Sequence, residues 1–198
     1  MNLDEERLAF YFHLGRATEQ WSYVELHLAL IVAWCFHSNK SNQAIAGYQS
    51  IENFRSRLGY VDAVLHRGNL PDREKENWAI LLDRCQQLAK KRNVLAHGWV
   101  FTDGDAKRAG RRVTLTSKFL SVASLKKPYA KIGLRDVVGY GQEFSALSMA
   151  LMNFHRRLSG KQERFPESEI PPLRPPTIAE IRREIYASAS RPPRSSRA

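Results

Sequence analysis

Three side chains near the middle of the chain have the types and the spacing to act together on a phosphate ester. Arg92, Asn93 and His97 lie in the stretch KKRNVLAHGW at 90–99. Histidine, with an ordinary pKa of about 6.5, can take the proton from a ribose 2′-hydroxyl near neutral pH. Arginine keeps its charge and can bind phosphate with a planar fork. Asn93, one helical turn from His97, could orient the imidazole or bind the phosphate. The three residues predict RNA cleavage without a metal ion.

These residues stand at the end of a helical pattern that runs from about 71 to 97. Arg92 falls in the middle of its apolar stripe, where a guanidinium is costly unless something pairs with it. Gly98 is expected to end the helix as a left-handed C-cap, which would let His97 turn toward Arg92. A second interpretation stays equally open from spacing alone. Lys91 and Arg92 could simply suit the negative end of the helix dipole, with His97 and Gly98 as a cap.

Three more helical patterns accompany it, over 4–37, 43–66 and 134–158. Asp4 is expected to cap the first helix, and the turn at 67–69 to close the second. Between the last two helices, the runs at 99–102 and 111–117 favour a β-hairpin. The fold class predicted is therefore mainly α: an up-and-down four-helix bundle with a β-hairpin insert (about 99–132) before the last long helix. One domain covers 1–160, and 161–198 form a proline-rich linker, a short helix and a basic low-complexity tail.

The first helix carries a second seam of small and polar residues beside its apolar seam. Small residues there would let a neighbouring helix or a dimer partner approach closely. Glu25, on this seam, is a candidate partner for Arg92, although a solvated carboxylate is the simpler interpretation. Arg57, on the second pattern, is also interpreted as solvated. The seam consists of Tyr11, Gly15, Thr18, Ser22, Glu25, Ala29 and Phe36.

The charge distribution favours a polyanionic partner. Of the net charge of +11, residues 1–98 contribute +1, residues 99–160 contribute +7 and residues 161–198 contribute +3. The most basic part therefore follows the RNVLAH stretch directly, which favours nucleic acid, although a solvated basic loop explains the charge equally well. Lys91 is a candidate supporting residue. The candidate RNA-contacting residues of the insert are Lys107, Arg108, Arg111 and Arg112.

Several classes of protein are disfavoured by composition. No run of 18 apolar residues occurs and the chain starts with acidic residues, so a cytoplasmic protein is expected. Cys35 and Cys85 lie on apolar stripes without CxxC spacing and are predicted to be buried free thiols. The histidines show no metal-ligand spacing, so neither a metal nor a cofactor is expected. Those on the first and last helices, His13, His27 and His155, are interpreted as surface or boundary residues.

The stretch from Arg92 to His97 resembles the signature of the HEPN superfamily (higher eukaryotes and prokaryotes nucleotide-binding). That signature has Arg, a polar residue that is usually Asn, and then His a few residues later, near the end of a helix in a bundle. The succession of helices fits the resemblance over about 4–160. The β-hairpin insert and the tail lie outside the family pattern.

The resemblance implies a metal-independent endoribonuclease that acts as a homodimer, with Arg92 and His97 of both chains lining one cleft and Asn93 at the intervening polar position. Many relatives are toxins of toxin–antitoxin pairs or effectors of phage defence, so an antitoxin or another protein is an expected partner. Relatives often add an acidic residue from an earlier helix, and Glu25 is the candidate here. The alternative is a non-catalytic module that binds RNA, a nucleotide or a partner protein through the same cleft.

Overall fold

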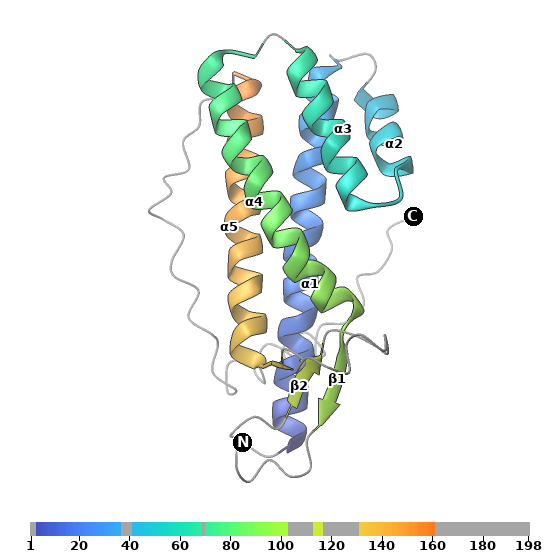
Figure 1. Cartoon of the computed structure of the whole chain (residues 1–198), viewed down its shortest axis with the longest axis vertical. Helices are drawn as coiled ribbons and strands as arrows, with labels where there is room; N and C mark the ends of the chain where they lie inside the picture. Colours follow the sequence, from blue (N-terminus) through green and yellow to red (C-terminus); the bar gives the residue numbers. More distant parts are fainter. Residues whose placement is uncertain (1–2, 37–40, 69, 103–112, 117–130, 161–198) are drawn as a thin grey trace, which may run out of the picture.

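The computed structural model describes residues 3–36, 41–68, 70–102, 113–116 and 131–160. Within these residues the chain forms a helical bundle with a small antiparallel sheet before the last helix, which confirms the predicted fold class (Figure 1). The predicted linker and tail (161–198) lie outside the described residues. The elements are α1 (Leu3–Cys35), α2 (Ser41–Ser50), α3 (Phe54–Arg67), α4 (Asp72–His97), β1 (Trp99–Thr102), β2 (Val113–Thr116), β3 (Lys131–Ile132) and α5 (Leu134–Leu158).

Helices α1 and α5 pack against each other more extensively than any other pair of elements. They lie side by side and run in the same direction (Figure 1). A Cβ added to Gly141 of α5 would lie 3.6 Å from Ala17, near the middle of α1. Further along, the rings of Trp21 and Phe144 are 5.1 Å apart in an edge-to-face contact. The apolar stripe predicted for 134–158 supplies this packing, since Val137, Phe144, Leu147, Leu151 and Phe154 are buried. Helix α4 crosses this pair diagonally.

The prediction of one continuous helix over 43–66 is wrong. The chain reverses direction at 51–53, so two helices, α2 and α3, take its place (Figure 1). Asn53 caps α3, since its side-chain Oδ1 accepts a hydrogen bond from the backbone N–H of Ser56 at 2.8 Å. Arg57 donates from Nε to the carbonyl of Ile51 at 2.7 Å, which holds the turn. This additional reversal makes α5 parallel to α1, where simple alternation of four helices would make it antiparallel.

Two predicted helix ends differ from the structure. Helix α1 begins at Leu3, so Asp4 lies inside the first turn and is not the N-cap. Helix α4 ends at His97 as predicted, but Gly98 has φ −79° and ψ 157°, an extended backbone and not a left-handed cap. Lack of space explains the glycine. A Cβ on Gly98 would lie 2.2 Å from Cδ2 of Leu115 and 2.6 Å from the carbonyl oxygen of Val94.

The sheet packs against the end of the bundle where α4 finishes. Its strand order is β1-β2-β3, with both pairs antiparallel and with Leu115 opposite Val100 and Ile132. Leu115 is fully buried. The backbone N–H of Val113 donates to Oε1 of Glu6 at 3.2 Å, which ties β2 to the first turns of α1. The predicted hairpin is thus present. Lys131–Ile132 adds a third strand beside it, while 117–130 lie outside the described residues.

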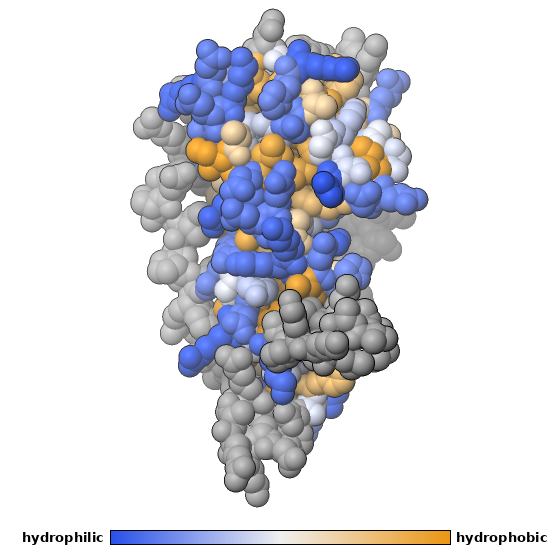
Figure 2. Space-filling view, in the orientation of Figure 1, coloured by the Kyte–Doolittle hydropathy of each residue, from blue (hydrophilic) through white to orange (hydrophobic). Residues whose placement is uncertain are grey.

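Hydrophilic side chains cover much of the described face along α4, and the apolar residues appear as separate patches (Figure 2). Among the described helices, none combines the length and the apolar character that a membrane crossing requires.

One of the two histidines of α1 is more enclosed than predicted, and the other lies at the boundary, as predicted. His13 is buried, so its interpretation as a surface or boundary residue is wrong. His27 is half-buried, and its pKa is lowered because burial removes water from the imidazolium and because His155 and Arg156 add positive charge nearby. In the unfolded chain the imidazole has an ordinary pKa of about 6.5, so it binds a proton more readily than in the folded chain. The folded state therefore keeps its full stability above about pH 6.5 and loses part of it as the pH falls below that value.

We therefore expect His27→Gln to reduce the loss of thermal stability on acidification. Melting temperatures of the wild type and the variant would be compared at about pH 7.5 and about pH 5.5. The wild type should lose more between the two values than the variant does. Equal losses would contradict the assigned role of His27.

Candidate functional site

A pocket of about 160 Å³ opens between α1 and α4. Its lining includes three large apolar side chains that are almost completely buried: Trp21, Leu95 and Phe144. Its wall is polar and comes mainly from α1, with Arg92 facing it from α4. The lining residues are Thr18, Trp21, Ser22, Glu25, Arg92, Leu95, Ala96 and Phe144. Part of the small-residue seam of α1 thus forms one wall of the pocket.

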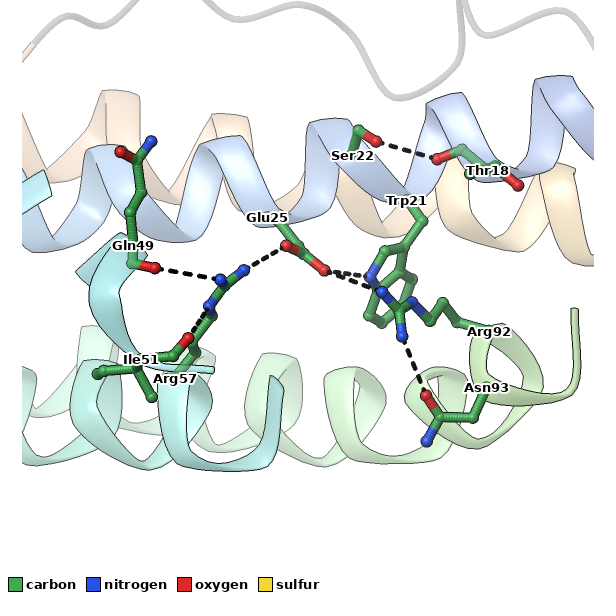
Figure 3. A network of polar contacts seen from close by, with 9 residues as sticks. All are labelled: Thr18, Trp21, Ser22, Glu25, Gln49, Ile51, Arg57, Arg92 and Asn93. Atoms are coloured by element: carbon green, nitrogen blue, oxygen red, sulfur yellow. Dashed lines mark hydrogen bonds and ion pairs between the residues drawn. The ribbon is translucent and has the colours of Figure 1, made fainter. Parts of the chain in front are cut away.

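Glu25 stands at the centre of the polar contacts at this pocket (Figure 3). Its Oε1 accepts a hydrogen bond from Nε1 of Trp21 at 2.8 Å, and its Oε2 pairs with Nη1 of Arg57 at 2.7 Å. Nη2 of Arg92 lies 3.9 Å from Oε1. The Glu25 side chain is only 22% exposed. The solvated interpretation of Glu25 is therefore wrong, and the alternative pairing with Arg92 is present as a long contact.

Arg57 was also predicted to be solvated, and this prediction is wrong as well, because its side chain is only 22% exposed. Besides its ion pair with Glu25, it donates to the backbone carbonyls of Ile51 at 2.7 Å and Gln49 at 3.3 Å. Its guanidinium also lies over the ring of Tyr48, 5.6 Å from the centroid. These two carbonyls are free to accept because helix α2 ends at Ser50 and α3 begins only at Phe54. The signal that could have revealed them was Asn53, a preferred N-cap residue in the middle of the predicted helix.

The guanidinium of Arg92 is only loosely held. Its Nη1 donates to Oδ1 of Asn93 at 3.3 Å, and its contact with Glu25 is at the outer limit of an ion pair. The side chain is 34% exposed and lines the pocket. A guanidinium has five N–H donors, and these two long contacts engage few of them strongly. Arg92 is therefore well placed to bind an anion that enters the pocket.

The structure does not bring His97 into this pocket within one chain. His97 is exposed, and helix α4 stays regular as far as this residue. Five helical steps from Arg92 turn the side chain by about 140°, so the two residues point in different directions. Asn93 and His97 lie one turn apart, as predicted, and both are exposed. The expected turn of His97 toward Arg92 at the helix end does not occur.

Lys91 is separate from the pocket. Its Nζ pairs with Oε2 of Glu143 on α5 and lies 4.9 Å from the ring centroid of Tyr140. These contacts join α4 to α5, so its position favours a structural role. The four candidate RNA-contacting residues of the insert, at 107, 108, 111 and 112, lie outside the described residues.

Thr18 and Ser22 carry hydroxyl groups in the pocket wall. The sequence placed both residues on the small-residue seam of α1 but did not predict that they line a pocket. Thr18 donates from Oγ1 to the carbonyl of Leu14 at 2.9 Å, and Ser22 donates from Oγ to the carbonyl of Thr18 at 3.2 Å. Each hydroxyl has one proton, and it is used in these bonds. Both oxygens are therefore left as acceptors at the pocket, opposite the cationic donors of Arg92.

No cluster of three or more histidine, cysteine or acidic side chains that could hold a metal occurs among the described residues. Cys85 is a buried free thiol, whereas Cys35 is only half-buried. Burial raises the pKa of Cys35 to about 11 and that of Cys85 to about 12, so both thiols stay protonated at neutral pH. Neither is therefore a good nucleophile or metal ligand.

Comparison with protein-family models, curated proteins and solved structures finds no significant match to this chain.

Proposed function

We propose that this chain is a HEPN-like, metal-independent endoribonuclease that acts as a homodimer. The observation that carries the proposal is the placement of Arg92: a loosely held guanidinium in the wall of a pocket, on the same last turns of α4 as the exposed His97. The motif resemblance and the basic charge after residue 98 support RNA as the ligand.

The proposed reaction uses the ribose of the substrate as its own nucleophile. The 2′-oxygen attacks the adjacent phosphorus, His97 takes the 2′-proton, and the bond from phosphorus to the 5′-oxygen breaks. The leaving oxygen takes a proton from water and becomes a 5′-hydroxyl, and the other fragment ends in a 2′,3′-cyclic phosphate. His97 then gives the 2′-proton up to the resulting hydroxide, which restores the neutral imidazole. Arg92 stabilises the negative charge that builds on the phosphate in the transition state. Asn93 is assigned to orient Arg92, which it contacts, or His97.

The directions of Arg92 and His97 support the homodimer. The two side chains diverge by about 140° within a chain, so in the proposed arrangement a second chain supplies the missing group to one phosphate. On the N-terminal side of the pocket residues, α1 exposes Leu8 and Tyr11, and a Cβ on Gly15 would meet nothing within 4 Å. This open face suits a second helix. Light scattering should show a dimer, and a strict monomer would contradict the shared cleft.

Incubation of the purified protein with labelled RNA in EDTA tests the proposed reaction. We expect defined fragments from ordinary RNA and none from the same sequence with 2′-O-methyl ribose, because the methyl group removes the nucleophile. Cleavage of the methylated RNA, or activity that EDTA abolishes, would contradict the proposal.

The same proposal includes a cytoplasmic role as a toxin or phage-defence effector whose activity an antitoxin protein inhibits.

The second candidate function is a non-catalytic module that binds RNA, a nucleotide or a partner protein. The observation that favours it is the absence of His97 from the residues that line the pocket with Arg92. In that case RNA binding should be lost in Arg92→Ala and retained in His97→Ala, with no cleavage by the wild type. Cleavage that depends on His97 would exclude this function.

A further inference from the structure

Three charged side chains stand in a row beside the pocket: Arg57, Glu25 and Arg92 (Figure 3). The two arginines compete for one carboxylate. Arg57 approaches Glu25 to 2.7 Å, whereas Arg92 stays at 3.9 Å. A charge-assisted hydrogen bond is strong near 2.7–2.9 Å and weakens quickly beyond that. Glu25 is therefore paired mainly with Arg57, on the side away from the pocket.

Contacts on the side away from Glu25 hold the Arg57 side chain in this position. The carbonyls of Ile51 and Gln49 accept two of its N–H groups, and Tyr48 lies under its guanidinium. All three come from the end of α2 and the turn that follows it. The arginine is thus anchored at the α2–α3 turn and reaches across to α1, while Trp21 occupies the other oxygen of Glu25.

We infer that Arg57 is a positioning residue that keeps Glu25 engaged, so that Arg92 stays available to a phosphate of bound RNA. Without the Arg57 charge, Glu25 would be an uncompensated, half-buried carboxylate next to Arg92. The two would form a close ion pair, which would neutralise the cation that faces the pocket. This inference rests on the phosphate-binding role of Arg92 in the proposed function.

The test measures the affinity of the dimeric protein for a 2′-O-methyl RNA, which can bind but cannot react. Arg57→Gln keeps hydrogen-bonding capacity and removes the charge, and we expect it to weaken binding by about tenfold. Arg57→Lys keeps the charge but loses the planar fork, so it should bind within about threefold of the wild type. The double variant Arg57→Gln with Glu25→Gln should recover most of the lost affinity, because no carboxylate remains to capture Arg92.

This recovery separates a charge effect from simple damage to the fold. Both single variants at Arg57 disturb the same backbone hydrogen bonds, so melting temperatures recorded alongside should fall in both, whereas binding should fall only in Arg57→Gln. Equal weakening by Gln and Lys, wild-type affinity in Arg57→Gln, or a double variant as weak as Arg57→Gln would each overturn the inference.

The binding assay, run beside the cleavage assay on ordinary RNA, distinguishes this inference from the proposed function. If the predicted pattern of affinities appears but the wild type cleaves no RNA, the catalytic proposal fails and the role of Arg57 stands. If the wild type cleaves RNA but Arg57→Gln binds like the wild type, only the inference fails. A wild type that neither binds nor cleaves RNA overturns both.

Discussion

Arg92→Ala is expected to lower the rate of RNA cleavage by about a thousandfold, because it removes the fixed cation that stabilises charge on the phosphate in the transition state. Arg92→Lys should restore only a small part of the rate, since an ammonium lacks the planar fork that grips two phosphate oxygens. Single-turnover cleavage of labelled RNA in EDTA measures the rates. Since the Arg92 side chain is one-third exposed and its contacts are long, both variants should fold normally.

The matched control for this experiment is Arg84→Ala, which removes an exposed arginine from the same helix outside the pocket. It should cleave RNA at a rate within about twofold of the wild type, apart from a small weakening of non-specific binding. If Arg84→Ala and Arg92→Ala lose activity equally, the effect is one of general positive charge, and the specific role of Arg92 is excluded.

Gly98→Ala is expected to destabilise the protein by about 2–4 kcal/mol, the second large effect. The added Cβ would overlap the side chain of Leu115 and, more seriously, the carbonyl oxygen of Val94, which belongs to the helix backbone. Either β2 must move off the end of α4 or the last turn of the helix must open. Urea unfolding followed by circular dichroism measures the loss.

Gly59→Ala is the control for Gly98→Ala. A Cβ on Gly59 meets nothing within 4 Å, and the residue lies inside α3. Alanine there should leave stability unchanged or raise it by about 0.5–1 kcal/mol, because it favours the helix. Similar stabilities for Gly98→Ala and the wild type would show that the sheet does not pack on the end of α4 as described.

The long helices were predictable because their burial follows their sequence periodicity. In α5 the residues that repeat every three or four positions are those that become buried, and α4 ends at His97, directly before a glycine. The reason for that glycine was not predictable. A glycine after a helix most often suggests a left-handed cap, but the need at Gly98 comes from Leu115, which is distant in sequence.

The break between α2 and α3 was missed because the apolar residues keep their spacing across it. Ile51 and Phe54 fit one helical stripe, yet Asn53 caps a new helix. This error hid the environment of Glu25, since Arg57 finds its backbone acceptors only at that turn. Sequence could suggest that Arg92 needs an acidic partner and offer Glu25, but it could not show that a second arginine binds Glu25 more closely.

The candidate site is therefore only partly what the sequence suggested. Arg92, Asn93 and Glu25 come together, while His97 points elsewhere in the same chain. The direction of a side chain at a helix end depends on whether the last turn unwinds, and spacing alone does not determine this. Under the proposed function, this divergence makes the dimer a requirement for catalysis.

The central claim, RNA cleavage by His97 and Arg92 without a metal, is tested most directly by analysing the ends of RNA fragments formed in EDTA. The wild type should produce 2′,3′-cyclic phosphate and 5′-hydroxyl ends, and His97→Ala should produce neither above the uncatalysed background. An equimolar mixture of refolded Arg92→Ala and His97→Ala chains should recover part of the activity, since one dimer then holds one intact residue of each kind. Equal production of these ends by the wild type and His97→Ala, or fragments with 5′-phosphate ends, would contradict the mechanism.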